Sequence, residues 1–125
     1  MTKRVLLVED EPNIIEALRF VLSRGGWTVE IHSDGVTALE RIRASDADVV
    51  VLDAMLPGRS GFDILRDLRA DPAHAERPVL MLTARGQKKD RELAETYGVS
   101  QYMTKPFANA EVLAALETLA REAQA

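Results

Sequence analysis

The chain has 125 residues, of which 46% are hydrophobic and 29% charged, and its formal net charge is −4. This length suits one domain, and the composition is that of a globular protein rather than a disordered one. The absence of cysteine excludes disulfides, thiolate metal sites and thiol nucleophiles, and the acidic balance argues against non-specific binding of nucleic acid. No apolar run approaches the ~18 residues of a membrane span, so the sequence predicts a soluble, cytoplasmic protein.

Short apolar runs alternate with amphipathic stretches along the chain. The runs, which are the expected strands, cover residues 5–8, 28–31, 49–52, 79–82 and, more weakly, 102–103. The stretches that follow them place apolar residues at helical spacing: Ile14 to Leu22, Val36 to Ile42, Phe62 to Leu68, Leu93 with Ala94, and Val112 to Leu119. Continuous Val-rich runs are typical of parallel strands buried on both faces. The pattern predicts a doubly wound α/β fold of three layers, with five parallel strands, as one domain over residues 1–125.

Polar residues stand where four of these runs stop. They are Glu9 and Asp10 after the first run, Asp53 after the third, Thr83 after the fourth, and Lys105 with Pro106 after the fifth. In an open parallel sheet, ligands bind beyond the carboxyl ends of the strands. Three carboxylates, a hydroxyl and an ammonium group are therefore expected at one edge of the sheet.

The chemistry of this set points to a phosphoryl group. Carboxylates about 5 Å apart repel by about 3 kcal/mol at an effective dielectric of about 20, so they take up protons or bind a hard cation. Oxygen ligands without cysteine or a nearby histidine favour Mg²⁺, which leaves room for phosphate oxygens. Lysine and a hydroxyl complete a phosphoryl clamp, and a carboxylate beside Mg²⁺ can itself become an aspartyl phosphate. Each feature alone is more often a turn or a cap; the coincidence at four strand ends favours a site.

Four segments resemble the response-regulator receiver domain of two-component signalling. They are 5–12 (VLLVEDEP), 51–58 (VLDAMLPG), 82–84 (LTA) and 102–107 (YMTKPF). The resemblance covers essentially the whole chain. It implies the sheet order 2-1-3-4-5 of this family.

The resemblance also implies how phosphorylation is supported. Asp53 is the expected phosphoryl acceptor. Asp10 and Asp53 are the expected direct ligands of Mg²⁺, together with the backbone carbonyl of Met55, and Glu9 acts mainly through water. The phosphoryl group is expected to come from a sensor histidine kinase or a histidine phosphotransfer protein.

The resemblance implies that the remaining motif residues respond to phosphorylation of Asp53. Lys105 is expected to contact the phosphoryl group, with a cis peptide bond to Pro106. Thr83 is the expected switch hydroxyl, and Tyr102 the aromatic side chain that follows it. Their movement would alter the face formed by the fourth helix, the fifth strand and the fifth helix.

That face is expected to bind an output protein. Its candidate contact residues are Lys88, Lys89, Arg91 and Glu111. Relatives that are transcription factors dimerise through several ion pairs here, of which this chain keeps only the pair of Arg91 with Glu111, and one exposed pair contributes at most about 1 kcal/mol. We therefore expect a monomer without direct contact to nucleic acid or membrane, and a phosphorylation-dependent dimer is the alternative.

Two other functions are less consistent with the sequence. A phosphatase with an aspartyl nucleophile needs a second acid two residues later, where this chain has Met55, which cannot transfer a proton. We expect no enzymatic activity beyond self-phosphorylation and self-dephosphorylation. A DNA-binding regulator needs a helix-turn-helix segment, which this sequence lacks. The initial Met and the lack of a linker favour a stand-alone receiver, with a domain trimmed from a larger regulator as the alternative.

Overall fold

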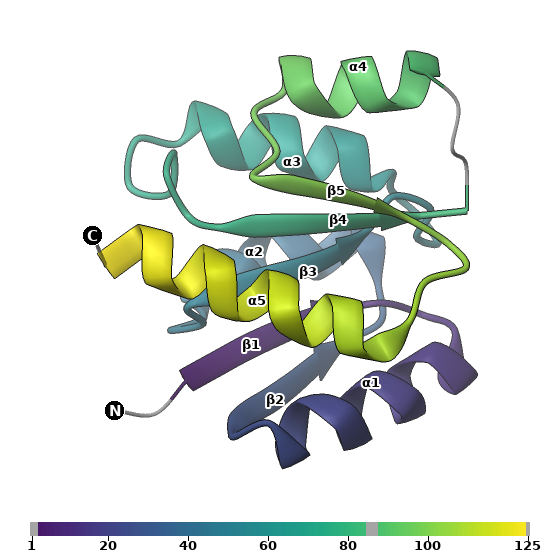
Figure 1. The fold of residues 1–125 in the computed structure, drawn as a ribbon. Helices are drawn as coiled ribbons and strands as arrows, with labels where there is room; N and C mark the ends of the chain where they lie inside the picture. Colours follow the sequence, from purple (N-terminus) through teal and green to yellow (C-terminus); the bar gives the residue numbers. More distant parts are fainter. Residues whose placement is uncertain (1–2, 85–87, 125) are drawn as a thin grey trace.

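The computed structural model describes residues 3–84 and 88–124, apart from the side chain of residue 124. Strands and helices alternate along this part of the chain (Figure 1). They are β1 (Lys3–Val8), α1 (Pro12–Arg24), β2 (Trp27–His32), α2 (Gly35–Ala44), β3 (Val49–Asp53), α3 (Gly61–Ala70), β4 (Val79–Thr83), α4 (Lys88–Thr96), β5 (Gln101–Thr104) and α5 (Asn109–Gln124). The predicted alternation of five strands with five helices is confirmed. The sequence placed the start of α4 near residue 87, which lies outside the described residues.

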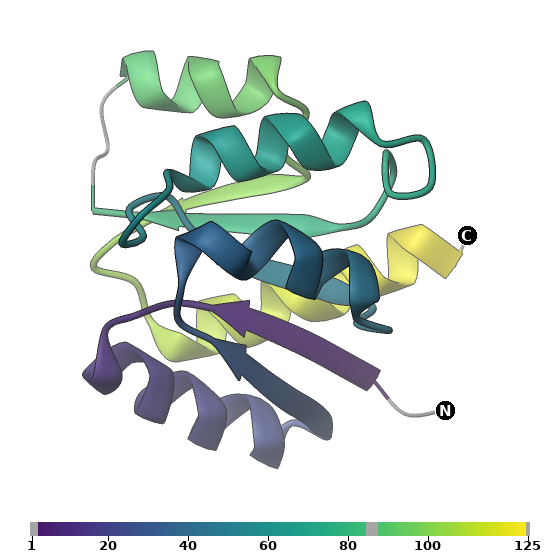
Figure 2. The same ribbon diagram turned by 180° about the vertical axis from the view of Figure 1, so that it is seen from behind.

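All five strands are parallel and form one sheet in the order β2-β1-β3-β4-β5. This is the order that the resemblance to receiver domains implied. Helices α1 and α5 cover one face of the sheet, while α2, α3 and α4 cover the other (Figures 1 and 2). The chain changes its direction of winding between β1 and β3, and a ligand site is expected at the carboxyl end of that pair.

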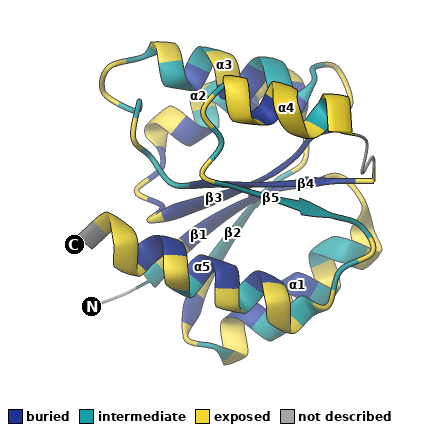
Figure 3. Cartoon of the chain, turned by 45° about the horizontal axis from the view of Figure 1, so that its top comes forward, coloured by how far each residue is buried: buried dark blue, intermediate teal, exposed yellow. Residues whose placement is uncertain are grey.

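Alternate residues of the strands form two hydrophobic cores. In β1, Leu6 and Val8 pack under α2, α3 and α4, whereas Val5 and Leu7 pack under α1 and α5. All four are fully buried, and each buried side chain of this size contributes about 1.5–3 kcal/mol to folding. The edge strand β5 is only half-buried (Figure 3). Burial on both faces explains why the central strands are continuous apolar runs without alternation.

Two helices begin close to the carboxyl edge of the sheet, each with a side-chain cap. The Asp34 carboxylate accepts a hydrogen bond of 3.0 Å from the backbone N–H of Val36 at the start of α2. The Ser60 hydroxyl accepts one of 3.1 Å from the N–H of Phe62 at the start of α3. Such caps satisfy N–H groups that have no partner within the helix. The loops between strand and helix are thereby fixed around the strand ends.

No helix of the described chain combines the length and the apolar character that crossing a membrane requires.

Candidate functional site

Three carboxylates meet at the ends of β1 and β3. Val8 lies beside Leu52 in the register of these two strands, so the residues that follow them are neighbours. Oxygen atoms of Glu9, Asp10 and Asp53 all lie within 4.8 Å of one another. Glu9 and Asp53 are buried, while Asp10 is exposed. The structure thus brings together the three acids that the sequence predicted, with one side open to solvent.

The Lys105 side chain reaches into this cluster from the segment after β5. Its Nζ lies 3.1 Å from Glu9 Oε1, 3.6 Å from Asp53 Oδ2 and 4.0 Å from Glu11 Oε2. The backbone N–H of Lys105 donates a hydrogen bond of 2.6 Å to the carbonyl of Thr83, which ties this segment to the end of β4. The peptide bond from Lys105 to Pro106 is cis.

The cluster holds more negative charge than Lys105 balances. Burial raises the pKa of Glu9, and the neighbouring Asp53 raises it further, while Lys105 opposes the shift. Burial alone would lower the pKa of Lys105, but its hydrogen bond with Glu9 and the charges of Asp53, Glu9 and Glu11 raise it. Lys105 therefore stays an ammonium group, and the surplus of carboxylates favours a bound cation.

The donor set suits Mg²⁺. All the candidate side-chain ligands offer oxygen atoms, and the exposure of Asp10 leaves room for the waters that Mg²⁺ retains. A pocket of about 420 Å³ opens here, and its lining includes Asp10, Asp53, Met55 and Lys105. The backbone N–H of Met55 donates a hydrogen bond of 3.1 Å to Asp53 Oδ1, which fixes the orientation of that carboxylate. The Met55 side chain is 49% exposed beside the pocket.

The switch candidates lie on β4 and β5, the next two strands of the sheet. Thr83 is fully buried at the end of β4, and Tyr102 is half-buried on β5. Burial raises the pKa of Tyr102, and hydrogen bonding with the Thr83 side chain partly offsets that rise. The Arg91 guanidinium of α4 lies over the Tyr102 ring, 5.3 Å from its centroid. The sequence predicted that Thr83 and Tyr102 act together, but not that Arg91 contacts the ring.

The other residues that the sequence predicted to contact an output protein lie in different surroundings from Arg91. Lys88 and Lys89 are exposed on α4, where Lys88 Nζ lies 3.8 Å from a carboxylate oxygen of Glu92. Glu111 Oε1 accepts a hydrogen bond of 3.1 Å from the backbone N–H of Ala108 at the start of α5. Glu111 is therefore engaged within its own chain.

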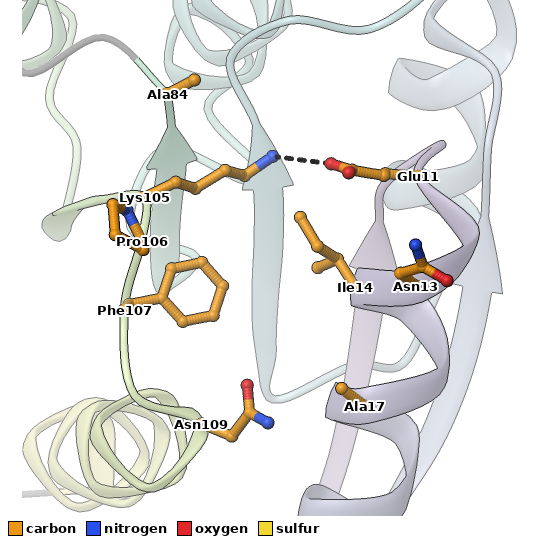
Figure 4. A pocket seen from close by; sticks show the side chains of 9 residues that line it. All are labelled: Glu11, Asn13, Ile14, Ala17, Ala84, Lys105, Pro106, Phe107 and Asn109. Atoms are coloured by element: carbon orange, nitrogen blue, oxygen red, sulfur yellow. Dashed lines mark ion pairs between the residues drawn. The ribbon is translucent and has the colours of Figure 1, made fainter.

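A second pocket of about 510 Å³ adjoins Lys105 between α1 and the segment before α5 (Figure 4). Ile14 and Ala17 of α1 line one side of it, and Phe107 lines the other. Lys105 points across its upper edge toward Glu11, with which it forms an ion pair. Sequence analysis missed this pocket, because apolar residues at helical spacing look the same whether they fill a core or line an opening.

Comparison with known proteins decides the family. The family model for the response regulator receiver domain matches residues 5–117. The chain belongs to this family. It is a receiver domain of the kind found in the response regulators of bacterial two-component systems.

Curated relatives of this receiver domain are transcriptional regulators. The alkaline phosphatase synthesis transcriptional regulatory protein PhoP of Bacillus subtilis (strain 168) is 37% identical over 124 residues, which are 99% of this chain and 51% of that protein. The transcriptional regulatory protein CreB of Escherichia coli (strain K12) is 42% identical over 117 residues, which are 94% of this chain and 50% of that protein. The chain thus spans about half the length of these relatives.

Solved receiver domains share the fold. The receiver domain of the Francisella response regulator 1452 aligns with a TM-score of 0.90 at 26% identity, covering 98% of this chain and 99% of that one. The receiver domain of the sensor histidine kinase PA1611 from Pseudomonas aeruginosa PAO1 aligns with a TM-score of 0.82 at 31% identity, covering 97% of this chain and 99% of that one. The latter structure has a magnesium ion coordinated in its active site cleft.

Proposed function

We propose that this receiver domain accepts a phosphoryl group on Asp53 from a phospho-histidine of a sensor histidine kinase or a histidine phosphotransfer protein. The observation that carries the proposal is the position of Asp53, at the end of the central strand β3. Carboxylate oxygens of Asp53, Glu9 and Asp10 lie within 4.8 Å of one another, and Asp53 Oδ2 lies 3.6 Å from Lys105 Nζ. A buried carboxylate between a cation and a set of cation ligands is suited to nucleophilic attack on phosphorus.

The residues around the acidic cluster each have a role in the proposed phosphoryl transfer. Asp10, Asp53 and the backbone carbonyl of Met55 would hold Mg²⁺, with Glu9 acting through water, and a bound ion would supply positive charge beside the phosphoryl oxygens. A carboxylate oxygen of Asp53 forms the new O–P bond as the P–N bond to the donor histidine breaks. The donor ring is protonated on its other nitrogen, so the electron pair of the P–N bond returns to the ring and the histidine leaves as neutral imidazole. The Lys105 ammonium compensates the charge of the transferred group.

The phosphorylated receiver domain would act as a switch rather than as an enzyme for other substrates. Thr83 is buried at the end of the strand next to β3, close enough in the sheet to respond to a group on Asp53. Tyr102, on the neighbouring strand β5, would carry the change to α4, β5 and α5. We propose that residues 1–125 form this single cytoplasmic domain and that the altered face binds an output protein through Lys88 and Lys89.

Phosphorylation with acetyl phosphate and Mg²⁺, followed by intact-mass measurement, tests the site. Wild-type protein should gain one phosphoryl group, and Asp53→Asn should gain none because the amide cannot attack phosphorus. Asp63→Asn, a change on the exposed side of α3, is the matched control and should be labelled like wild type. Labelling of Asp53→Asn at the wild-type rate would disprove the assignment.

A further inference from the structure

Helix α4 is held to the rest of the domain by few buried contacts. Ala94 is the fully buried residue of this helix in the described chain, and Leu93 is partly exposed. Elements with little buried apolar surface move at low energetic cost. Single contacts between α4 and neighbouring elements therefore have a large influence on where this helix lies.

One such contact joins α4 to β5. The Arg91 guanidinium lies 5.3 Å from the centroid of the Tyr102 ring, within the ~6 Å range of a cation–π interaction. Tyr102 lies beside Met81 in the register of β4 and β5, and its ring packs against the core under α2, α3 and α4. Lys88, by comparison, lies 3.8 Å from Glu92 on its own helix. Among the basic side chains of α4, Arg91 is thus the one placed to hold the ring.

The ring of Tyr102 lies on the same face of the sheet as the switch hydroxyl. Thr83 is fully buried at the end of β4, and its register partner on β5 is Thr104, two residues after Tyr102. A threonine hydroxyl has one donor hydrogen and two acceptor lone pairs. The Thr83 hydroxyl can therefore donate its single hydrogen either on the side of Tyr102 or to a phosphoryl oxygen on Asp53, so a phosphoryl group would draw it away from the ring.

We infer that Arg91 is a positioning residue that couples α4 to the ring of Tyr102, so that a shift of Thr83 toward a phosphoryl group displaces the helix. This inference rests on the proposed phosphorylation of Asp53. The relay runs from Asp53 through Thr83 and Tyr102 to Arg91. It assigns to Arg91 a role inside the chain that does not need a second subunit.

Beryllofluoride with Mg²⁺, a stable mimic of the phosphoryl group, tests the coupling by NMR. In wild-type protein, amide resonances of the active site and of α4 should both shift. In Arg91→Ala, the active-site resonances should still shift, while the equilibrium constant for displacement of α4 should fall about two- to five-fold, which corresponds to the ~0.5–1 kcal/mol of an exposed cation–π contact. Arg91 is exposed, so this variant is expected to fold.

Two further variants separate the ring contact from charge alone. Arg91→Lys keeps the charge but loses the planar group that stacks on the ring, so it should give an intermediate response of α4. Arg121→Ala makes the same change at an exposed position of α5 and should respond like wild type. A response of α4 in Arg91→Ala equal to that of wild type would overturn the inference and leave the phosphorylation site intact. A wild-type protein whose active-site resonances do not respond to beryllofluoride would overturn the proposed function, and this inference with it.

Discussion

Adjacent acids at the end of β1 have opposite surroundings. Glu9 is buried against Lys105, with 3.1 Å between its Oε1 and the Nζ, whereas Asp10 is exposed. Both residues follow the end of β1 at Val8, where the direction of the chain decides which side chain is buried. Asp10 is therefore the acid best placed to bind a cation that enters from solvent and keeps some of its water.

Replacing this exposed acid should remove most of the stabilisation by magnesium. At about 100 times its dissociation constant, a ligand that binds only the folded state adds ~2.7 kcal/mol to the free energy of unfolding. We expect a clear rise in the melting temperature of wild-type protein with Mg²⁺ over EDTA, and little rise for Asp10→Asn. Asp63→Asn on α3 should behave like wild type. Equal melting temperatures of wild-type protein in EDTA and in millimolar Mg²⁺ would argue against a metal site.

The neighbouring Glu9 makes the metal-free protein sensitive to pH. Its pKa is raised in the folded state above the ordinary value of 4.5, chiefly by burial. A raised pKa of an acid contributes stability below its unfolded pKa, and this contribution is lost as the pH rises through the folded pKa. In EDTA, Glu9→Gln should therefore gain stability relative to wild type as the pH rises from 4.5 toward neutrality. Thermal melts across this range measure the difference; a gap that narrows with rising pH would contradict it.

At the scale of elements, the start of α3 is packed directly against β3, the strand that carries the proposed phosphoryl acceptor. The backbone N–H of Gly61 donates a hydrogen bond of 2.9 Å to the carbonyl of Ala54. A Cβ atom at Gly61 would overlap the carbonyl oxygen of Asp53. Only glycine permits this close approach, which sets the position of the loop beside the acidic cluster.

Adding a methyl group here should therefore disturb both stability and phosphorylation. We expect Gly61→Ala to lower the free energy of unfolding by about 1–3 kcal/mol, as overpacking of a close contact does, and to slow labelling by acetyl phosphate. Urea denaturation measures the first effect and intact mass the second. Ala70→Ser, at an exposed position of the same helix, should change stability by less than about 0.5 kcal/mol. A Gly61→Ala protein as stable as wild type would show that the loop can move away from Asp53.

The sequence predicted elements and strand ends better than contacts between segments. Buried strands such as β3 are continuous apolar runs, and strand ends place Asp53 and Lys105 at one edge whatever the details of packing. The position of Arg91 over Tyr102 depends on the rotamers of two side chains from different segments, and no spacing rule encodes it. The burial of Glu9 beside an exposed Asp10 likewise depends on the direction of the chain as it leaves β1.

At the scale of the whole molecule, the proposed protein donor would approach Asp53 from the carboxyl edge of the sheet. The apolar pocket between α1 and Phe107 opens on this edge, directly beside Lys105. Apolar hollows beside a reactive group are suited to receive side chains of a docking partner. A small-molecule donor such as acetyl phosphate needs no such surface.

A charge placed in this pocket should therefore separate the two kinds of donor. Ala17→Glu puts a carboxylate among the apolar side chains of Ile14 and Phe107, at a helical position that tolerates glutamate. We expect phosphotransfer from a phospho-histidine protein that labels wild type to fall at least about tenfold, equivalent to about 1.4 kcal/mol. Labelling by acetyl phosphate should stay at the wild-type rate. An unchanged rate from the protein donor would show that it docks elsewhere.

The charges on the face formed by α4, β5 and α5 disfavour self-association of the whole molecule. The one pair that a symmetric dimer would keep here is Arg91 with Glu111, and both are engaged within the chain, with the Tyr102 ring and the N–H of Ala108 respectively. Glu117 and Glu122 add negative charge to α5, Glu122 at an exposed position.

We therefore expect phosphorylation to leave the receiver domain monomeric at micromolar concentration. Repulsion between exposed carboxylates is screened beyond about 8–10 Å at physiological salt, so its contribution is modest. The missing cross-subunit attraction matters more, because association has to overcome the loss of translational and rotational freedom. Analytical ultracentrifugation with and without beryllofluoride measures the outcome, and Glu117→Lys with Glu122→Lys, which reverses these charges, should shift the equilibrium toward the dimer. A complete shift of wild-type protein to dimer at a few micromolar would mean that contacts other than these ion pairs hold two receiver domains together.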